Sequence, residues 1–122
     1  MPSAKSLRGS AAERAVAQHL QRLGFEIVAT NLRLGRLEID VVARDGPVIA
    51  VVEVRTRGIG AWTRGLGSVD GKKRRRIRLA GARLWQRRYR TDASVERLRF
   101  DVASVTFPEE GEPRIEYVVA AF

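Results

Sequence analysis

Apolar residues recur along this chain with two different periods, one typical of helices and the other typical of strands. In residues 10–23, the apolar side chains that share one helical face are Ala12, Val16, Leu20 and Leu23. Ser10 is suited to cap this helix, with Glu13 three residues later as in a capping box, and Gly24 is suited to end it. We therefore predict a helix over residues 10–23 that buries this apolar face.

The rest of the chain predicts strands around a second helix. The predicted strands cover residues 25–30, 37–44, 48–55, 95–107 and 114–122. The second helix covers residues 72–90, and its buried stripe contains Ile77, Ala80, Leu84 and Trp85. Residues 1–8 are expected to be flexible, and residues 58–71, with five of the eleven glycines, to form a mobile loop. The order α-β-β-β-α-β-β within 122 residues predicts a single α/β domain over residues 1–122.

Positive charge is concentrated in one part of the chain. Residues 55–90 hold thirteen of the 23 Lys and Arg residues but one of the 14 acidic residues, and the whole chain has a net charge of +9. Such segregation favours contact with nucleic acid over a basic face that only keeps the protein soluble. The candidate nucleic-acid contacts are Arg57, Trp62, Arg64, Lys72, Lys73, Arg74, Arg75, Arg76, Arg83 and Arg87. Trp62 is a candidate for stacking on a base, with a role as an ordinary loop anchor as the alternative.

Several classes of protein do not fit this composition. The chain has no cysteine, which excludes disulfides and thiolate metal sites. No window approaches the roughly 18 apolar residues of a membrane span, and the N-terminal residues lack the apolar region of a secretory signal. We therefore expect a cytoplasmic protein without a membrane contact.

Carboxylates interrupt the two strands that flank the turn at residues 45–48. Asp40 lies in the first of these strands and Glu53 in the second. If residues 45–48 form a four-residue loop, Arg44 pairs with Ile49 and Asp40 lies directly opposite Glu53. A three-residue loop without a bulge would place the two carboxylates on opposite faces of the sheet.

Two facing carboxylates repel each other unless one of them is protonated or a cation lies between them. One candidate is a hard divalent ion, Mg²⁺ or Mn²⁺, and the other is an ion pair with Arg55, two residues after Glu53. Glu13 could add a third carboxylate from the first helix, although the capping box with Ser10 is a competing interpretation.

The order and spacing of three motifs resemble the YraN family of small bacterial proteins. The motifs are "EID" at residues 38–40, "VVEVRTR" at 51–57 and "RFDV" at 99–102, within a resemblance that runs from about residue 9 to residue 105. That family in turn resembles the PD-(D/E)XK nucleases, including the archaeal Holliday-junction resolvases. The resemblance implies a restriction-endonuclease-like core, a mixed central β-sheet flanked by helices. It also implies metal-assisted hydrolysis of nucleic-acid phosphodiesters, with DNA favoured over RNA and branched DNA as a candidate substrate. A homodimer is the candidate assembly.

The same resemblance implies roles for individual residues. Asp40 and Glu53 would be the metal-binding acids, and Glu13 the acid contributed by a helix. The motif expects lysine where this chain has Arg55, and arginine cannot act as a base, although it can contact the scissile phosphate. Lys72 could supply positive charge from the second helix, with an ordinary solvated lysine as the favoured alternative.

Three functions therefore compete on sequence grounds. The first is a metal-dependent DNA nuclease, and the second is a nucleic-acid-binding module that has lost turnover. The third is a basic accessory protein that docks on RNA or another anionic partner. We assign structural roles to His19, the only histidine, and to Asp101, which would pair with Arg99 or with a hydrogen-bond donor of the core.

Overall fold

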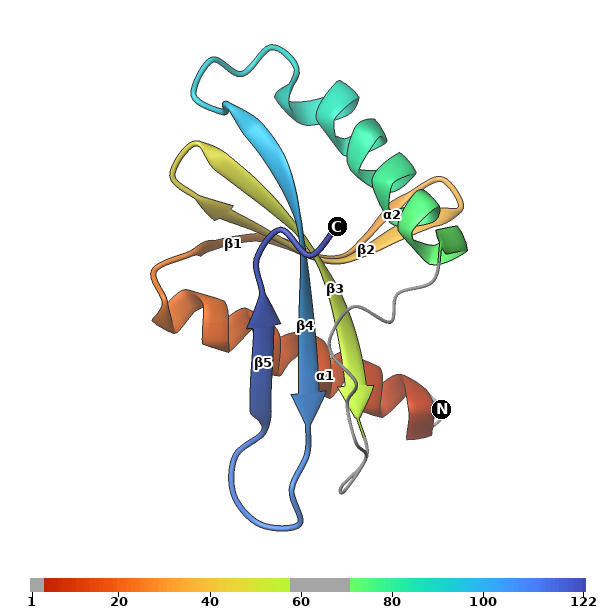
Figure 1. The fold of residues 1–122 in the computed structure, drawn as a ribbon, viewed down its shortest axis with the longest axis vertical. Coiled ribbons are helices and arrows are strands. Elements are labelled where there is room, and N and C mark those ends of the chain that lie inside the picture. The colour runs from red at the N-terminus through yellow and green to blue at the C-terminus, as the bar shows by residue number, and fades with distance from the viewer. Residues whose placement is uncertain (1–3, 58–70) are drawn as a thin grey trace.

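A five-stranded mixed sheet forms the centre of the protein in a computed structural model that describes residues 4–57 and 71–122 (Figure 1). The elements in chain order are α1 (Ala4–Arg22), β1 (Glu26–Leu34), β2 (Leu37–Asp45), β3 (Val48–Arg57), α2 (Gly71–Leu84), a π-helical turn (Trp85–Tyr89), β4 (Arg97–Thr106) and β5 (Arg114–Val118). Strands lie side by side in chain order, and all neighbours are antiparallel except β3 and β4. The predicted element order and the predicted mixed sheet flanked by helices are confirmed.

Helix α1 covers one face of the sheet. Its buried side chains Ala12, Val16 and Leu20 pack with inward-facing residues of β2 and β3, such as Val41 and Val52. The prediction that Leu23 belongs to this buried face was wrong, because the helix ends at Arg22 and the Leu23 side chain is 59% exposed.

The predicted start of this helix at Ser10 was also wrong. Helix α1 begins at Ala4, so that Ser10 lies inside it and does not cap it. The residues before Ser10 include several good helix formers, and a serine inside a helix costs little. The capping box between Ser10 and Glu13 is therefore excluded, and Glu13 lies in the middle of α1.

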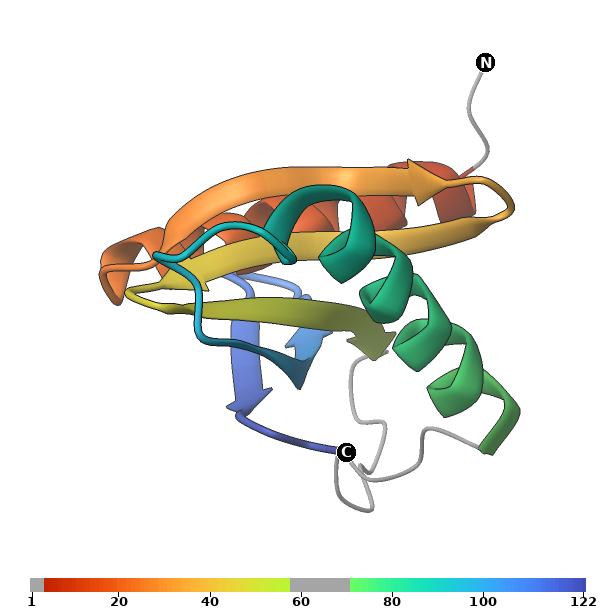
Figure 2. The same cartoon turned by 90° about the horizontal axis from the view of Figure 1, so that it is seen from above.

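Helix α2 covers the opposite face (Figure 2). Ile77, Ala80 and Leu84 are buried as predicted, and they pack with residues that include Ile49 and Val51 of β3. Gly81 is also buried, and a Cβ atom there would lie 2.8 Å from the Phe100 ring. Glycine thus allows α2 to lie close to β4.

The β2–β3 hairpin has the register that brings Asp40 towards Glu53. Arg44 pairs with Ile49, which is the alternative that a four-residue loop would give, and Asp45 also pairs with Val48. The connecting turn is therefore shorter than predicted. Gly46 occupies a left-handed conformation in this turn, with φ +58°, which glycine adopts without strain.

A buried ionic cluster attaches the C-terminal residues to β4. Asp101 is fully buried and accepts hydrogen bonds from Arg99 Nε at 2.9 Å and from the backbone N–H of Ala120 at 2.8 Å. The Tyr117 hydroxyl donates a further hydrogen bond to the same carboxylate. Asp101 thus joins β4, β5 and the residues after β5, as expected of a structural residue.

Within the described residues, no helix is both long enough and apolar enough to cross a membrane.

We predict that Asp101→Asn lowers the free energy of unfolding by about 2–4 kcal/mol, because Arg99 would keep a partly buried charge without its anionic partner. Urea denaturation would measure this change. Glu110→Gln removes the same charge from an exposed position and should change stability by less than about 0.5 kcal/mol. Equal stability of the two variants would contradict a structural role for Asp101.

Candidate functional site

The candidate site lies where β2 and β3 separate. The two strands pair from Val41–Val52 to the turn, and their ladder goes no further. Residues 37–39 of β2 remain paired with β1, while residues 53–57 of β3 remain paired with β4. The ribbons of β2 and β3 therefore diverge (Figure 1), and Asp40 and Glu53 are the first residues beyond the ladder.

The Asp40 side chain bridges the two strands at this point. Its Oδ2 atom accepts a hydrogen bond of 2.9 Å from the backbone N–H of Val54, which replaces a strand-to-strand backbone bond. Desolvation and the nearby charge of Glu53 raise the pKa of Asp40 to about 8, although the Val54 hydrogen bond opposes this change. At neutral pH, without a bound cation, Asp40 therefore holds a proton and can share a hydrogen bond with Glu53.

Two more carboxylates lie beside Asp40. Glu13 of α1 and Glu38 of β2 each place an oxygen in a group with Asp40 whose atoms all lie within 4.8 Å of one another. Burial raises the pKa of Glu13, and the negative charges of Glu38 and Glu53 raise it further, against a hydrogen bond with Asn31 that lowers it. The structure thus brings together Glu13, Asp40 and Glu53, the three acidic residues selected from the sequence.

Sequence reasoning missed two residues of this site. Glu38 lies two positions before Asp40 on the same strand, so strand alternation places both side chains on one face, and this signal could have identified it. Asn31 of β1 has a positive φ of 50°, a conformation that Asn tolerates better than most residues. Its side chain hydrogen-bonds to Glu13, which no sequence pattern indicated.

Apart from its place in the acidic cluster, Glu38 takes part in an exposed ion pair with Arg33. Arg33 lies 3.7 Å from its carboxylate, with side-chain exposures of 75% for Arg33 and 37% for Glu38. An ion pair this exposed contributes little to stability.

Glu53 forms an ion pair with a side chain of helix α2. The Glu53 side chain is 10% exposed, and Lys73 Nζ lies 2.7 Å from its Oε1 atom. Lys72, the lysine singled out from the sequence as a source of charge at the site, is exposed on the same helix.

Arg55 follows Glu53 on β3, two positions further along the strand. Its side chain is half-buried, and it lies in register with Ser104 of β4. The Ser104 hydroxyl is buried and has no hydrogen-bond partner among the described residues. A phosphate contact for Arg55 remains a prediction.

The remaining basic candidates differ in exposure. The exposed ones are Lys72, Arg75, Arg76 and Arg87. Arg83 has a structural contact instead, since its Nη1 donates a hydrogen bond of 3.0 Å to the Leu34 carbonyl and so attaches α2 to the β1–β2 turn. The Arg74 guanidinium lies 5.9 Å from the centre of the Phe122 ring.

Part of the predicted nucleic-acid surface lies outside the described residues. This part comprises Trp62, Arg64, nearly all of the predicted mobile loop at residues 58–71, and the side chain of Arg57.

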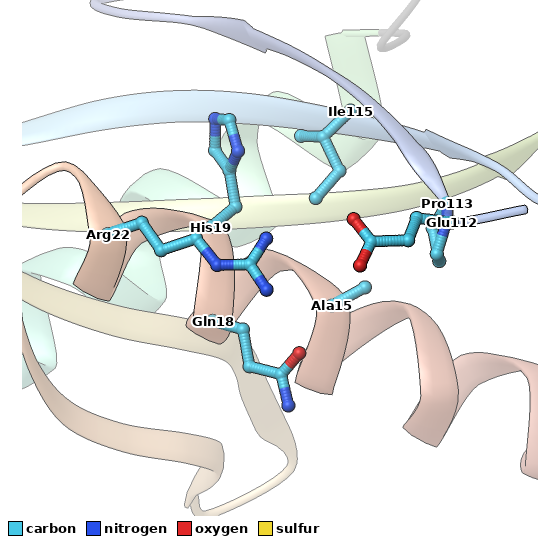
Figure 3. Close-up of a pocket in the computed structure, with 7 residues that line it drawn as sticks. All are labelled: Ala15, Gln18, His19, Arg22, Glu112, Pro113 and Ile115. Atoms are coloured by element: carbon cyan, nitrogen blue, oxygen red, sulfur yellow. The ribbon is translucent and has the colours of Figure 1, made fainter.

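A separate pocket lies between α1 and the segment that enters β5 (Figure 3). Its lining residues are Ala15, Gln18, His19, Arg22, Glu112, Pro113 and Ile115. This lining contains one carboxylate and shares no residue with the acidic cluster. His19 is partly exposed in this pocket, and the structural role expected for it remains a prediction.

The donor set of the acidic cluster fits a hard divalent cation. All candidate ligands are carboxylate oxygens, which suit Mg²⁺ or Mn²⁺ better than softer metals. Oxygen ligands lie about 2.1 Å from Mg²⁺, so two of them are at most about 4.2 Å apart. Small side-chain rotations would therefore bring oxygens of Glu13, Glu38 and Asp40 around one ion.

The raised pKa of Asp40 predicts how the metal-free stability depends on pH. Between its ordinary value of 3.8 and about 8, the folded protein binds a proton that the unfolded chain has released, so stability falls as pH rises through this range. The slope for this one group is at most about 1.4 kcal/mol per pH unit. We predict that Asp40→Asn, which keeps an acceptor for Val54, removes this slope.

Urea denaturation with a chelator at several pH values would test this prediction. Asp45→Asn, on the exposed end of the same strand, is the matched control and should keep the slope. A parent protein whose stability is independent of pH across this range would contradict the raised pKa.

Comparison with known proteins identifies relatives of similar length. Residues 12–105 match the model of the uncharacterised protein family UPF0102. A UPF0102 protein of Sorangium cellulosum is 57% identical over 99% of this chain and 85% of its own length. A UPF0102 protein of Acidothermus cellulolyticus is 41% identical over 98% of this chain and 96% of its own length. The resemblance to YraN proteins is thereby confirmed, and this chain belongs to the UPF0102 family.

Proposed function

We propose that this protein is a divalent-metal-dependent nuclease that hydrolyses DNA phosphodiesters, with branched DNA as a candidate substrate. The observation that carries this proposal is the crowding of four carboxylates where β2 and β3 separate. Burial of these carboxylates, together with the charges of their neighbours, raises the pKa of Asp40 to about 8 and also raises the pKa of Glu13. Such a cluster is unfavourable without a cation and becomes favourable when a divalent ion neutralises it.

Each acidic residue has a distinct place in this proposal. Asp40, Glu13 and Glu38 would hold the ion. Glu53 lies within hydrogen-bond reach of Asp40 and would act beside this group. A bound Mg²⁺ or Mn²⁺ would supply Lewis-acid polarisation of the phosphate and of an attacking water. The Val54 hydrogen bond fixes the orientation of the Asp40 carboxylate, which reduces the reorganisation needed on binding.

Basic residues would position the substrate beside this cluster. Arg55 would contact the phosphate from β3, and its permanent charge would stabilise the charge that develops on the phosphate oxygens. The exposed residues Lys72, Arg75 and Arg76 at the start of α2 would bind neighbouring phosphates. Positive charge therefore lies on the helix that also reaches the acidic cluster through Lys73.

A binding module without turnover is the second candidate, and Arg55 is the observation that favours it. Arginine remains protonated, so it cannot accept a proton from an attacking water as a lysine of lowered pKa can. The acidic cluster would then bind an ion that helps to hold DNA without cleaving it.

We predict that Mn²⁺ binds the parent protein and that Asp40→Asn reduces this affinity by at least about tenfold, because one anionic ligand becomes neutral. Isothermal titration calorimetry would measure both affinities. Asp45→Asn should bind Mn²⁺ like the parent. The same proteins would then be assayed with Mn²⁺ on linear and branched DNA, where Asp40→Asn should lower cleavage by at least about a hundredfold.

The two candidate functions differ in the behaviour of Arg55→Lys. For a nuclease, the parent cleaves DNA. For a binding module, the parent binds Mn²⁺ and DNA but does not cleave, and cleavage gained by Arg55→Lys would show that the site lost its turnover through this one residue. A parent that binds no Mn²⁺, with or without DNA, would contradict both.

We further predict that Arg75→Ala and Arg76→Ala each weaken binding to any DNA sequence and reduce the slope of log affinity against log salt by about 1. Fluorescence anisotropy at several salt concentrations would measure this slope. Arg114→Ala removes an exposed charge from β5, away from α2, and should leave the slope unchanged. An unchanged slope in all three variants would exclude α2 as the DNA-binding surface.

A further inference from the structure

Lys73 occupies a position on α2 that normally holds an apolar side chain. The buried residues of this helix are Ile77, Ala80, Gly81 and Leu84. Lys73 lies one helical turn before Ile77, so it continues the same stripe and faces the sheet. Lys72, one residue earlier, is rotated by about 100° around the helix axis and is exposed.

The ammonium group of Lys73 contacts a buried carboxylate, although the Lys73 side chain as a whole is partly exposed. Its Nζ atom lies 2.7 Å from Glu53 Oε1, while the side-chain exposures are 43% for Lys73 and 10% for Glu53. The flexible stem of lysine allows the ammonium to move towards solvent without a backbone change. Glu53, in contrast, is fixed in the middle of the sheet by the pairing of β3 with β4.

We propose that Lys73 is an exchangeable counter-ion, which pairs with Glu53 in the metal-free protein and moves to a phosphate of bound DNA when a divalent ion occupies the acidic cluster. This inference rests on the proposed metal site and adds a coupling between metal binding and DNA binding. Both the ion and the ammonium are attracted to Glu53, and they repel each other at short range.

The exchange has a physical advantage for both binding steps. Before the ion binds, Lys73 compensates part of the negative charge in a crowded cluster and thereby limits repulsion among the carboxylates. Once a divalent ion supplies that compensation, the ammonium is available for a phosphate, which offers strong charge-assisted hydrogen bonds. Metal and DNA should therefore each strengthen the binding of the other, by the same factor.

Calorimetry with Mn²⁺ alone provides the first test. Lys73→Gln removes the charge but keeps a hydrogen-bond donor for Glu53, so the folded structure should survive, which circular dichroism would verify. We expect this variant to bind Mn²⁺ about three- to tenfold more tightly than the parent, because the competing ammonium is gone. Lys72→Gln, the matched control, should bind Mn²⁺ like the parent, and Lys73→Arg should restore the weaker parental affinity.

DNA binding with and without a divalent ion provides the second test. Ca²⁺ takes the same oxygen ligands, and anisotropy with a short duplex would report its effect on DNA affinity. In the parent, Ca²⁺ should strengthen DNA binding, and this gain should be lost in Lys73→Gln. In Lys72→Gln, DNA affinity should fall by the same factor with and without Ca²⁺, so that the gain is retained.

The outcomes separate this inference from the proposed function. If the parent binds Mn²⁺ and Lys73→Gln binds it no more tightly, Lys73 is a permanent structural partner of Glu53 and the exchange is overturned while the metal site stands. If Ca²⁺ strengthens DNA binding equally in parent and variant, the coupling does not run through Lys73. A parent that binds no Mn²⁺ overturns both the site and the exchange.

Discussion

The separation of β2 from β3 beyond Val41 and Val52 is the constraint on which the candidate site depends. A continued ladder would satisfy the backbone groups of both strands and leave no place for a side chain between them. Because β2 stays with β1 and β3 stays with β4, the Val54 N–H instead binds the carboxylate of Asp40. The hydrogen bond that the sheet loses is thus replaced by one that orients an acidic side chain.

This separation also lets both helices contribute to one site, although they cover opposite faces of the sheet. Glu13 comes from α1, whose neighbouring residue Ala12 is part of one buried cluster. Lys73 comes from α2, whose Ile77 belongs to the other cluster. A continuous sheet would separate the side chains on its two faces. Glu13 of α1 could not then lie beside Asp40, which is next to the Glu53 that pairs with Lys73 of α2. The apolar cores therefore position the charged groups, and a packing defect on either face would disturb the same cluster.

Periodicity and turn chemistry in the sequence were sufficient for the element order. They left the register of the β2–β3 hairpin open between two alternatives, and the pairing of Arg44 with Ile49 decides between them. They were insufficient where a result depends on tertiary contact. Ser10 has the chemistry of a helix cap but lies inside α1, because the helix extends back to Ala4 through residues that include the good helix formers Lys5, Leu7 and Arg8. Glu38 was discoverable from strand alternation with Asp40. Asn31 was not, since its role depends on how β1 lies beside α1.

Lys72 and Lys73 are neighbours in the sequence, but their tertiary contacts differ, and composition alone does not predict this difference. In the run of basic residues that begins α2, composition alone treats every member as equivalent. A single step along a helix, however, changes direction by about 100°, which separates a lysine in solvent from one that reaches a buried glutamate. The apolar stripe of the helix carries this information, because Ile77 lies four residues after Lys73. Arg55 cannot substitute for that lysine, since it is attached to the strand that carries Glu53, whereas Lys73 is attached to a separate helix and can leave the carboxylate without moving it. A cation that must exchange between two anions is therefore better placed on α2 than on β3.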